Sequence, residues 1–348
     1  MAAVKGYHAL LALRFVLGAL EAGFGSGVMF ILSSWYKRDE QAKRFSIFYS
    51  AAVLSGAFGG IIAGAITSSL DGARGISGWQ WLFIVKGAAT IACAAIGALV
   101  LPDFPATTKR FSPRQKQVAL ERLKSDNVTT RAEDSLSLTP LQALRNSLMN
   151  WRTWPLTFGY MYRYSHVTFQ AMGGSATMSY FYPTLVAGLG YTAHMAQYMV
   201  VPIYSVAFVA VLATGYFNDK YPYYRGIVIA GLLAASMICS IIVCAVYNFT
   251  ARYVLLVFMA SSLLSGNALS VAYASSTFAP MQLEMRAVSL AFLNGMANLS
   301  QIYGAYLFPA QDAPKYLMGF GVISGLSALC VVVYSMAHIF IHRYPIQG

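Results

Sequence analysis

Charged side chains are scarce in this 348-residue chain, and acidic ones are the scarcest. Only 10% of the residues are charged, with 12 Asp and Glu against 24 Lys and Arg. A soluble domain usually carries about 25% charged residues. Hydrophobic residues reach 57%, and the mean hydropathy is +0.57. The composition therefore argues against a water-soluble fold and favours a protein embedded in a lipid bilayer.

Cysteine is also rare, and its placement excludes further classes. The four cysteines, Cys93, Cys239, Cys244 and Cys330, fall in apolar stretches, so a disulfide framework is not expected. The chain has no Cys or His spacing typical of a metal site and no hydrolase motif in an enzyme context. We therefore expect no cofactor and no catalytic activity. The net charge of +12 is explained by membrane orientation and requires no nucleic acid partner.

What the chain has in abundance is apolar stretches long enough to cross a bilayer, which takes about 20 residues each. The spans are expected at about 7–34, 46–69, 80–101, 154–185, 195–215, 226–247, 252–275, 286–308 and 317–341. They should be helices, because lipid offers the backbone no hydrogen-bond partners. The expected fold is an all-α integral membrane protein with about nine transmembrane helices.

Basic residues between the spans predict which side of the membrane each connection faces. If Met1 lies outside, the inner connections hold seventeen Lys and Arg, and the outer connections hold four. Cytoplasmic loops of membrane proteins carry such an excess, and a basic inner surface meets anionic lipid. The sequence therefore predicts an outward start and a basic cytoplasmic face.

The longest polar segment divides the spans three and six. We expect a partial N-terminal transmembrane bundle over 1–101, a cytoplasmic central loop over 102–153, and a six-helix bundle over 154–348. Within the loop, Ser112 followed by Pro113 is typical of a helix start. This predicts a short amphipathic helix that ends near Lys124.

Several sequence runs, taken together, indicate a family. They include an Arg followed four residues later by Gly in the first span, a polar run after that span, an aromatic run opening the third, a Pro-Asp-Phe-Pro sequence, and a Gly-to-Arg run late in the chain. With two further runs, Gly56–Gly60 and Asp312–Tyr316, the seven runs in order are Arg14–Phe24, Ser34–Arg44, Gly56–Gly60, Gly78–Ile84, Leu101–Pro105, Gly215–Gly226 and Asp312–Tyr316. Together they resemble major facilitator superfamily transporters, and among these the fungal anion:cation symporter group, which includes allantoate, nicotinate and pantothenate permeases.

The resemblance implies a function, and it also shows where this chain departs from the family pattern. It implies a monomeric, multi-pass carrier, expected in the plasma membrane, that moves a small organic anion together with protons by alternating access. Family members have twelve helices, whereas this chain aligns from the fourth onward and is expected to lack the first three. The alternative is therefore a truncated, non-transporting relative or a membrane sensor.

Ionisable groups inside predicted spans are candidates for function, because burying charge in lipid is costly. Arg14 and Glu21 are seven residues apart and share one face of the first span. They are candidates for substrate or proton coupling, in which a carboxylate changes protonation beside a fixed cation. The alternative is a static pairing inside the bundle.

A second pair of candidates lies in the long fourth span. Arg163 falls near mid-depth, and a guanidinium there suits a carboxylate substrate because it can form two parallel hydrogen bonds. His166 lies three residues on, and its imidazole could carry a transported proton. The alternative for both is a structural pairing or a reach to the membrane surface.

The resemblance also implies a role for two residues in the connection between the fifth and sixth spans. Asp219 and Arg225 match the superfamily's cytoplasmic signature between the eighth and ninth helices. They are expected to form a charge latch that changes between the inward-facing and outward-facing states. The alternative is a solvated turn.

Overall fold

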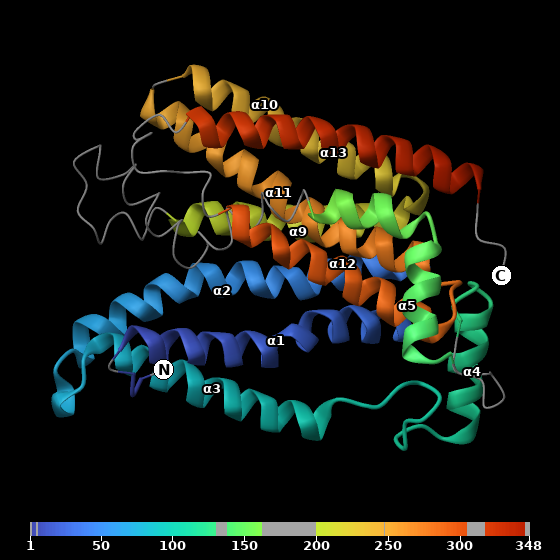
Figure 1. Cartoon of the computed structure of the whole chain (residues 1–348), viewed down its shortest axis with the longest axis horizontal. Coiled ribbons are helices and arrows are strands. Elements are labelled where there is room, and N and C mark those ends of the chain that lie inside the picture. Colours follow the sequence, from blue (N-terminus) through green and yellow to red (C-terminus); the bar gives the residue numbers. More distant parts are fainter. Residues whose placement is uncertain are drawn as a thin grey trace.

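The computed structural model describes residues 2–4, 6–129, 138–161, 200–246, 248–304 and 317–344, and no residue in these ranges belongs to a strand. The long helices run side by side along one axis (Figure 1). They are α1 (Tyr7–Trp35), α2 (Gln41–Leu70), α3 (Gly78–Val100), α9 (Val200–Lys220), α10 (Arg225–Ala245), α11 (Phe249–Phe278), α12 (Leu283–Gly304) and α13 (Leu317–Arg343). Residues 153–161 are also helical.

Length and composition suit these helices to a bilayer. Within the described ranges, six helices are long and apolar enough to cross a membrane: α1, α3, α9, α10, α11 and α13. Most of their outward side chains are apolar, as Phe15 at 80% exposure and Leu99 at 77% illustrate. Such side chains are stable against lipid tails, and each helix satisfies its own backbone hydrogen bonds. The expected all-helical, multi-pass membrane fold is confirmed.

Eight of the nine expected spans coincide with long helices to within a few residues. The largest shifts are at the polar ends, where α2 begins at Gln41 and α9 continues to Lys220. These extra turns carry polar residues, of which Gln41 and Asn218 are fully buried, so hydropathy does not detect them. Only residues 154–161 of the expected 154–185 span lie in the described part of the chain, so the count of nine spans stays a prediction.

Two short helices of the central segment lie across one end of the bundle (Figure 1). In α4 (Pro113–Lys124), the Ser112 hydroxyl accepts from the Gln115 backbone N–H at 3.3 Å, which confirms the helix start expected there. The sequence reading did not anticipate α5 (Pro140–Met149), which Thr139 caps in the same way. Each cap satisfies a backbone donor that would otherwise lack a partner.

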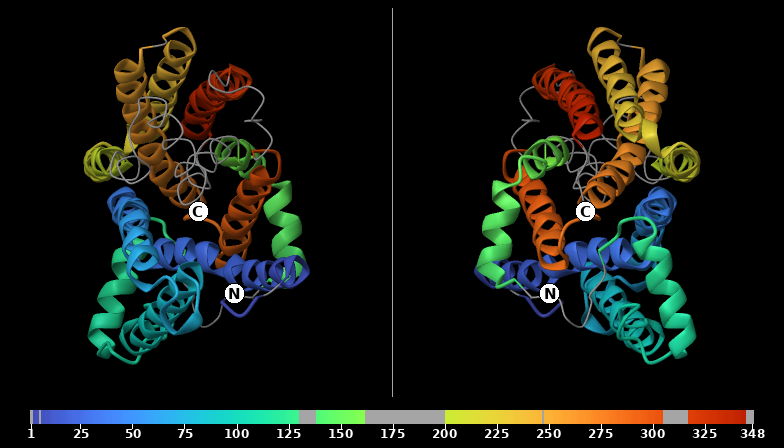
Figure 2. Two further views of the ribbon diagram at one scale, coloured as in Figure 1. Left: turned by 90° about the vertical axis from the view of Figure 1, so that its left-hand side faces the viewer. Right: turned by 90° about the vertical axis from the view of Figure 1, so that its right-hand side faces the viewer.

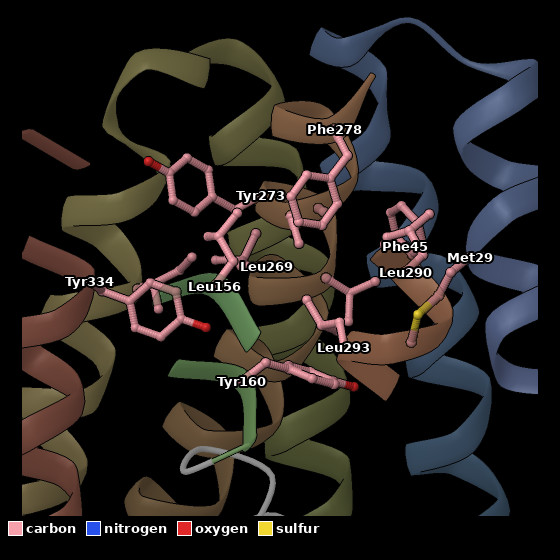
Figure 3. Packing of buried hydrophobic residues seen from close by; sticks show 14 of the residues in the cluster. Met29, Phe45, Leu156, Tyr160, Leu269, Tyr273, Phe278, Leu290, Leu293 and Tyr334 are labelled. Carbon is pink, nitrogen blue, oxygen red and sulfur yellow. The ribbon is translucent and has the colours of Figure 1, made fainter. Parts of the chain in front are cut away.

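The long helices form two groups that face each other (Figure 2). The first group is α1, α2 and α3, and the second is residues 153–161 with α9 to α13. The second group buries more of its helices. In the most apolar 18-residue stretch of α11, 67% of the residues are buried, whereas none are buried in the corresponding stretch of α3. One cluster of buried hydrophobic residues includes members of both groups (Figure 3). The two groups are therefore packed together.

Candidate functional site

The two groups meet at the end of the bundle that carries α4 and α5 (Figure 1). At this end α1, α9, α11 and α13 finish, and α2, α10 and α12 begin. We call the contact between the two groups at this end the gate region. It contains an apolar plug, two buried arginines, a close helix crossing and a bridge from the central segment.

The apolar plug joins side chains from both groups. Met29 of α1 and Phe45 of α2 lie against Leu290 and Leu293 of α12 (Figure 3), and all four are at most 3% exposed. Burying a side chain of this size contributes about 1.5–3 kcal/mol. The plug excludes water from the gate region and stabilises contact between the groups.

The expected Asp219–Arg225 pair is present in the gate region. The Arg225 Nη2 lies 3.5 Å from the Asp219 Oδ1, and the Arg225 side chain is 3% exposed. The other carboxylate oxygen, Oδ2, accepts from the backbone N–H of Lys43 at 3.0 Å. Asp219 therefore connects the end of α9 both to the start of α10 and to the start of α2 in the opposite group. Whether the pair rearranges during transport stays a prediction.

A second buried arginine, Arg286, joins α12 to α1. Its Nη2 donates to the Ser34 hydroxyl at 3.1 Å, and its Nη1 donates to the Ala279 carbonyl at 3.3 Å. The guanidinium also lies 5.6 Å from the centre of the Phe30 ring. The residue is fully buried, and among the described residues it makes no ion pair. A guanidinium in such a place is held by its fixed fork of donors and by the aromatic ring.

The two groups approach most closely where α9 crosses α2. A Cβ atom at Gly215 would lie 2.3 Å from the Ser46 Oγ and 3.2 Å from the Ala42 carbonyl oxygen. Only glycine allows the helices to come this close. Ser46 is 1% exposed and Ala42 is fully buried. The small residues thus set the closed separation of α2 and α9.

The turn after α4 bridges the two groups from outside the bundle. Arg122 of α4 makes an ion pair with Glu40, and the Asp126 carboxylate accepts from the Arg38 backbone N–H at 2.5 Å. On the other side, Thr129 donates from its backbone N–H to the Ala279 carbonyl at 3.1 Å. The central segment is therefore attached to the first group by charge and to the second by backbone hydrogen bonding.

Two polar contacts lie deeper between the groups. The Asn294 Nδ2 of α12 donates to the Ser26 hydroxyl of α1 at 3.3 Å. The Tyr49 hydroxyl of α2 lies 3.2 Å from the Tyr160 hydroxyl of the 153–161 helix. Both are neutral pairs that can exchange partners at little cost, so they suit surfaces that separate and rejoin.

The expected coupling residues Arg14 and Glu21 do not lie in the gate region. Both are exposed on α1, and among the described residues neither makes an ion pair. They share one helix but not one contact, so the structure does not bring them together. Arg163 and His166 lie outside the described residues. The assignment of these four residues to coupling and substrate binding stays a prediction.

Sequence reasoning missed several residues of the gate region. From sequence, Arg286 is one of the seventeen basic residues expected at the inner connections, and it lies two residues after Glu284 at the start of an apolar helix. Its burial depends on Ser34, 252 positions away in sequence. Asn294 and Tyr49 are single polar groups within apolar stretches, which is only a weak indication of a functional role.

Comparisons with known proteins support one family. Residues 1–305 match the Major Facilitator Superfamily. The MFS-type transporter cnsO of Penicillium expansum is 31% identical over 97% of this chain and 65% of its own length. The pantothenate transporter liz1 of Schizosaccharomyces pombe is 35% identical over 44% of this chain and 29% of its own length. The chain spans less than two thirds of the length of these relatives.

A solved structure shares the fold. The proton:xylose symporter XylE, bound to 6-bromo-6-deoxy-D-glucose, matches with a TM-score of 0.61 over 91% of this chain and 66% of the other. The two sequences are 12% identical, so the likeness concerns the helix arrangement alone. The relatives are named as transporters, and no catalytic activity is indicated.

Proposed function

Because this chain belongs to the Major Facilitator Superfamily, we propose that it is a proton-coupled symporter of a small organic anion in the plasma membrane. The observation that carries the proposal is a membrane helix, α1, that holds both a cation and a carboxylate, Arg14 and Glu21, in a chain of this family. Ionised groups at such positions are retained where they bind or couple. The carrier acts as a monomer and needs the anion, protons and the bilayer.

Transport proceeds by alternating access. The gate region holds the two groups together at the basic end, through the apolar plug and the Asp219 and Arg286 contacts. Opening requires the loss of these contacts, and substrate and proton binding shift the balance between the two states. In this proposal the chain divides into residues 1–101, 102–153 and 154–348, and the first and third parts rock against each other.

The substrate class follows from the sign of the candidate groups. Arg14 and Arg163 can bind a carboxylate, and Glu21 or His166 can take up the accompanying proton. A carboxylate, vitamin or ureide of small size fits this set. Pantothenate is the first probe, since a partial relative, liz1, is named as a pantothenate transporter.

An uptake assay tests the proposal. The chain is reconstituted in vesicles, and labelled pantothenate, nicotinate and allantoate are added with and without an inward proton gradient. We expect accumulation of at least one anion that a protonophore abolishes. Glu21→Gln should remove the dependence on the gradient, whereas Glu121→Gln, an exposed carboxylate on α4, should keep it.

Two results would contradict the proposal. Uptake that is equal with and without the gradient would exclude proton coupling. No uptake of any labelled carboxylate by a correctly inserted chain would favour the alternative, a truncated relative or a membrane sensor. The names of the relatives do not favour that alternative, because they are transporters.

A further inference from the structure

The short helix α5 has three distinct faces. Ala143 and Ser147 are fully buried, and the Ser147 hydroxyl donates to the Met285 carbonyl of α12 at 3.1 Å. This small-residue face rests on the bundle. Most of the rest of the helix is exposed: Leu141 is 76% and Leu144 is 38% exposed, whereas Leu148 is half-buried.

The uncovered surface of α5 is divided by polarity. At about 100° per residue, Leu141, Leu144 and Leu148 fall on one flank. Gln142 and Asn146 fall on the opposite flank, about 160° from Leu144 and Leu148 respectively, and the last residue of the helix, Met149, lies beside Gln142 and is 73% exposed. If α5 lay free in the cytoplasm, both flanks would be exposed to water, and the exposed leucines along one flank would be unfavourable. A helix at a membrane surface has this division.

Arg145 lies between the two flanks, and it is exposed. Just beyond the helix, the Arg152 guanidinium lies 5.0 Å from the centre of the Trp151 ring. Trp151 is 42% exposed. Tryptophan is enriched at membrane surfaces, because its ring is apolar and its N–H is polar. Arginine beside it can meet a lipid phosphate or carboxylate.

The position of α5 agrees with its polarity. It lies across the basic end of the bundle, roughly at right angles to the long helices (Figure 1) and at the periphery, beside α12 (Figure 2). The Trp154 N–H donates to the Leu148 carbonyl at 2.8 Å, and the Trp154 ring packs edge-on against Phe292 of α12. The apolar surface of α5 is thus continuous with the apolar surface of the spanning helices.

We propose that α5 lies in the headgroup layer of the inner leaflet and binds an anionic phospholipid through Arg145. Leu141, Leu144 and Leu148 enter the edge of the hydrocarbon layer, and Gln142 and Asn146 face water. Arg145 lies at the level of the lipid phosphates, where a negatively charged headgroup is attracted to it, whereas the half-buried Arg152 donates from its Nη2 to the Tyr344 carbonyl at 2.5 Å. The proposal does not depend on the transported substrate.

Spin labels test the immersion of α5. In a variant whose four native cysteines are replaced, a label is attached to Leu141→Cys or to Asn146→Cys, and the chain is placed in phospholipid vesicles. The label at position 141 should collide more with oxygen, which concentrates in lipid, than with a water-soluble nickel chelate. The label at 146, the matched control on the same helix, should show the reverse. Preference for the chelate at both positions would overturn the proposal.

Brominated lipids test the headgroup. A variant that retains only Trp151 among the five tryptophans is placed in vesicles with brominated phosphatidylserine or brominated phosphatidylcholine at equal content. The serine lipid should quench fluorescence about 2- to 5-fold more, the enrichment a basic residue produces at an anionic surface. Arg145→Gln should remove at least half of the difference, and Arg114→Gln on α4 should not. Equal quenching by both lipids would refute anionic selectivity.

Discussion

The Asp219 carboxylate has two partners, one for each of its oxygens. Its two oxygens take the Arg225 guanidinium and the Lys43 backbone N–H, and the latter belongs to the opposite group of helices. Lys43 and Asp219 are 176 positions apart in sequence. A contact of this kind can favour the closed gate only while the carboxylate stays charged and in place. Two residue-scale predictions follow from the buried cations of the gate region.

Asp219→Asn should weaken closure at the basic end. The amide can still accept from Lys43 but leaves the buried Arg225 without its counter-charge, at a cost of about 1–3 kcal/mol. The readout is maleimide labelling of Met29→Cys in the plug, in a background without native cysteines. Labelling should accelerate about 5- to 150-fold. Asp103→Asn, an exposed residue after α3, is the control, and an unchanged rate in Asp219→Asn would contradict the latch.

Arg286→Lys should open the same region although the charge is kept. Lysine has no planar fork, so it cannot donate at once to Ser34 and Ala279 while facing Phe30. We expect a loss of about 1–2 kcal/mol of closure, for two weakened hydrogen bonds and the ring contact. The same labelling assay measures it, with the exposed Arg343→Lys as control. Equal rates in the two variants would show that only the charge of Arg286 matters.

At the scale of residues, the sequence predicts contacts between residues that are close along the chain better than contacts between distant ones. Asp219 and Arg225 lie six positions apart in a signature run, so a resemblance was sufficient to pair them. Arg286 looks like any other basic residue at a helix start, because its partners come from α1 and from the end of α11. Charge in a span identified Arg14 and Glu21 as candidates, but hydropathy cannot tell which neighbours such groups meet.

At the scale of elements, the crossing of α2 and α9 depends on the absence of a side chain. Gly215 faces Ser46 and Ala42 at distances that leave no room for a Cβ atom. Neither residue is unusual in a membrane helix, where small residues allow close packing. The crossing follows from tertiary packing, whereas the helices themselves follow from apolar length.

Gly215→Ala should therefore push α9 away from α2. The added methyl would lie 2.3 Å from the Ser46 Oγ, and overpacking of this kind costs about 1–3 kcal/mol. Labelling of Met29→Cys should accelerate, and Ser46→Gly should restore the slow rate in the double variant. Gly231→Ala on α10, where no atom lies within 4 Å of the new methyl, is the matched control. Failure of Ser46→Gly to rescue would contradict the crossing as the cause.

At the scale of the whole molecule, the helix ends that adjoin the basic connections lie at one end of the bundle. The ends of α1, α9, α11 and α13 and the starts of α2, α10 and α12 lie together with α4 and α5 (Figure 1). The basic connections predicted from the sequence to be cytoplasmic are attached there. The sequence therefore predicted which ends lie together, because consecutive spans must alternate in direction. It could not predict that the two groups meet at that same end, since this depends on the plug and on the bridge after α4.

The sidedness of that end is the remaining whole-molecule prediction. Lys and Arg are retained on the cytoplasmic side during insertion, so the end that carries α4 should face the cell interior. Asn127→Cys, exposed in the turn after α4, and Arg74→Cys, exposed in the connection between α2 and α3, are labelled separately with a membrane-impermeant maleimide. In intact cells only position 74 should react, and position 127 should react once the membrane is permeabilised. Labelling of position 127 in intact cells would invert the topology, and the gate region would then close the outer side.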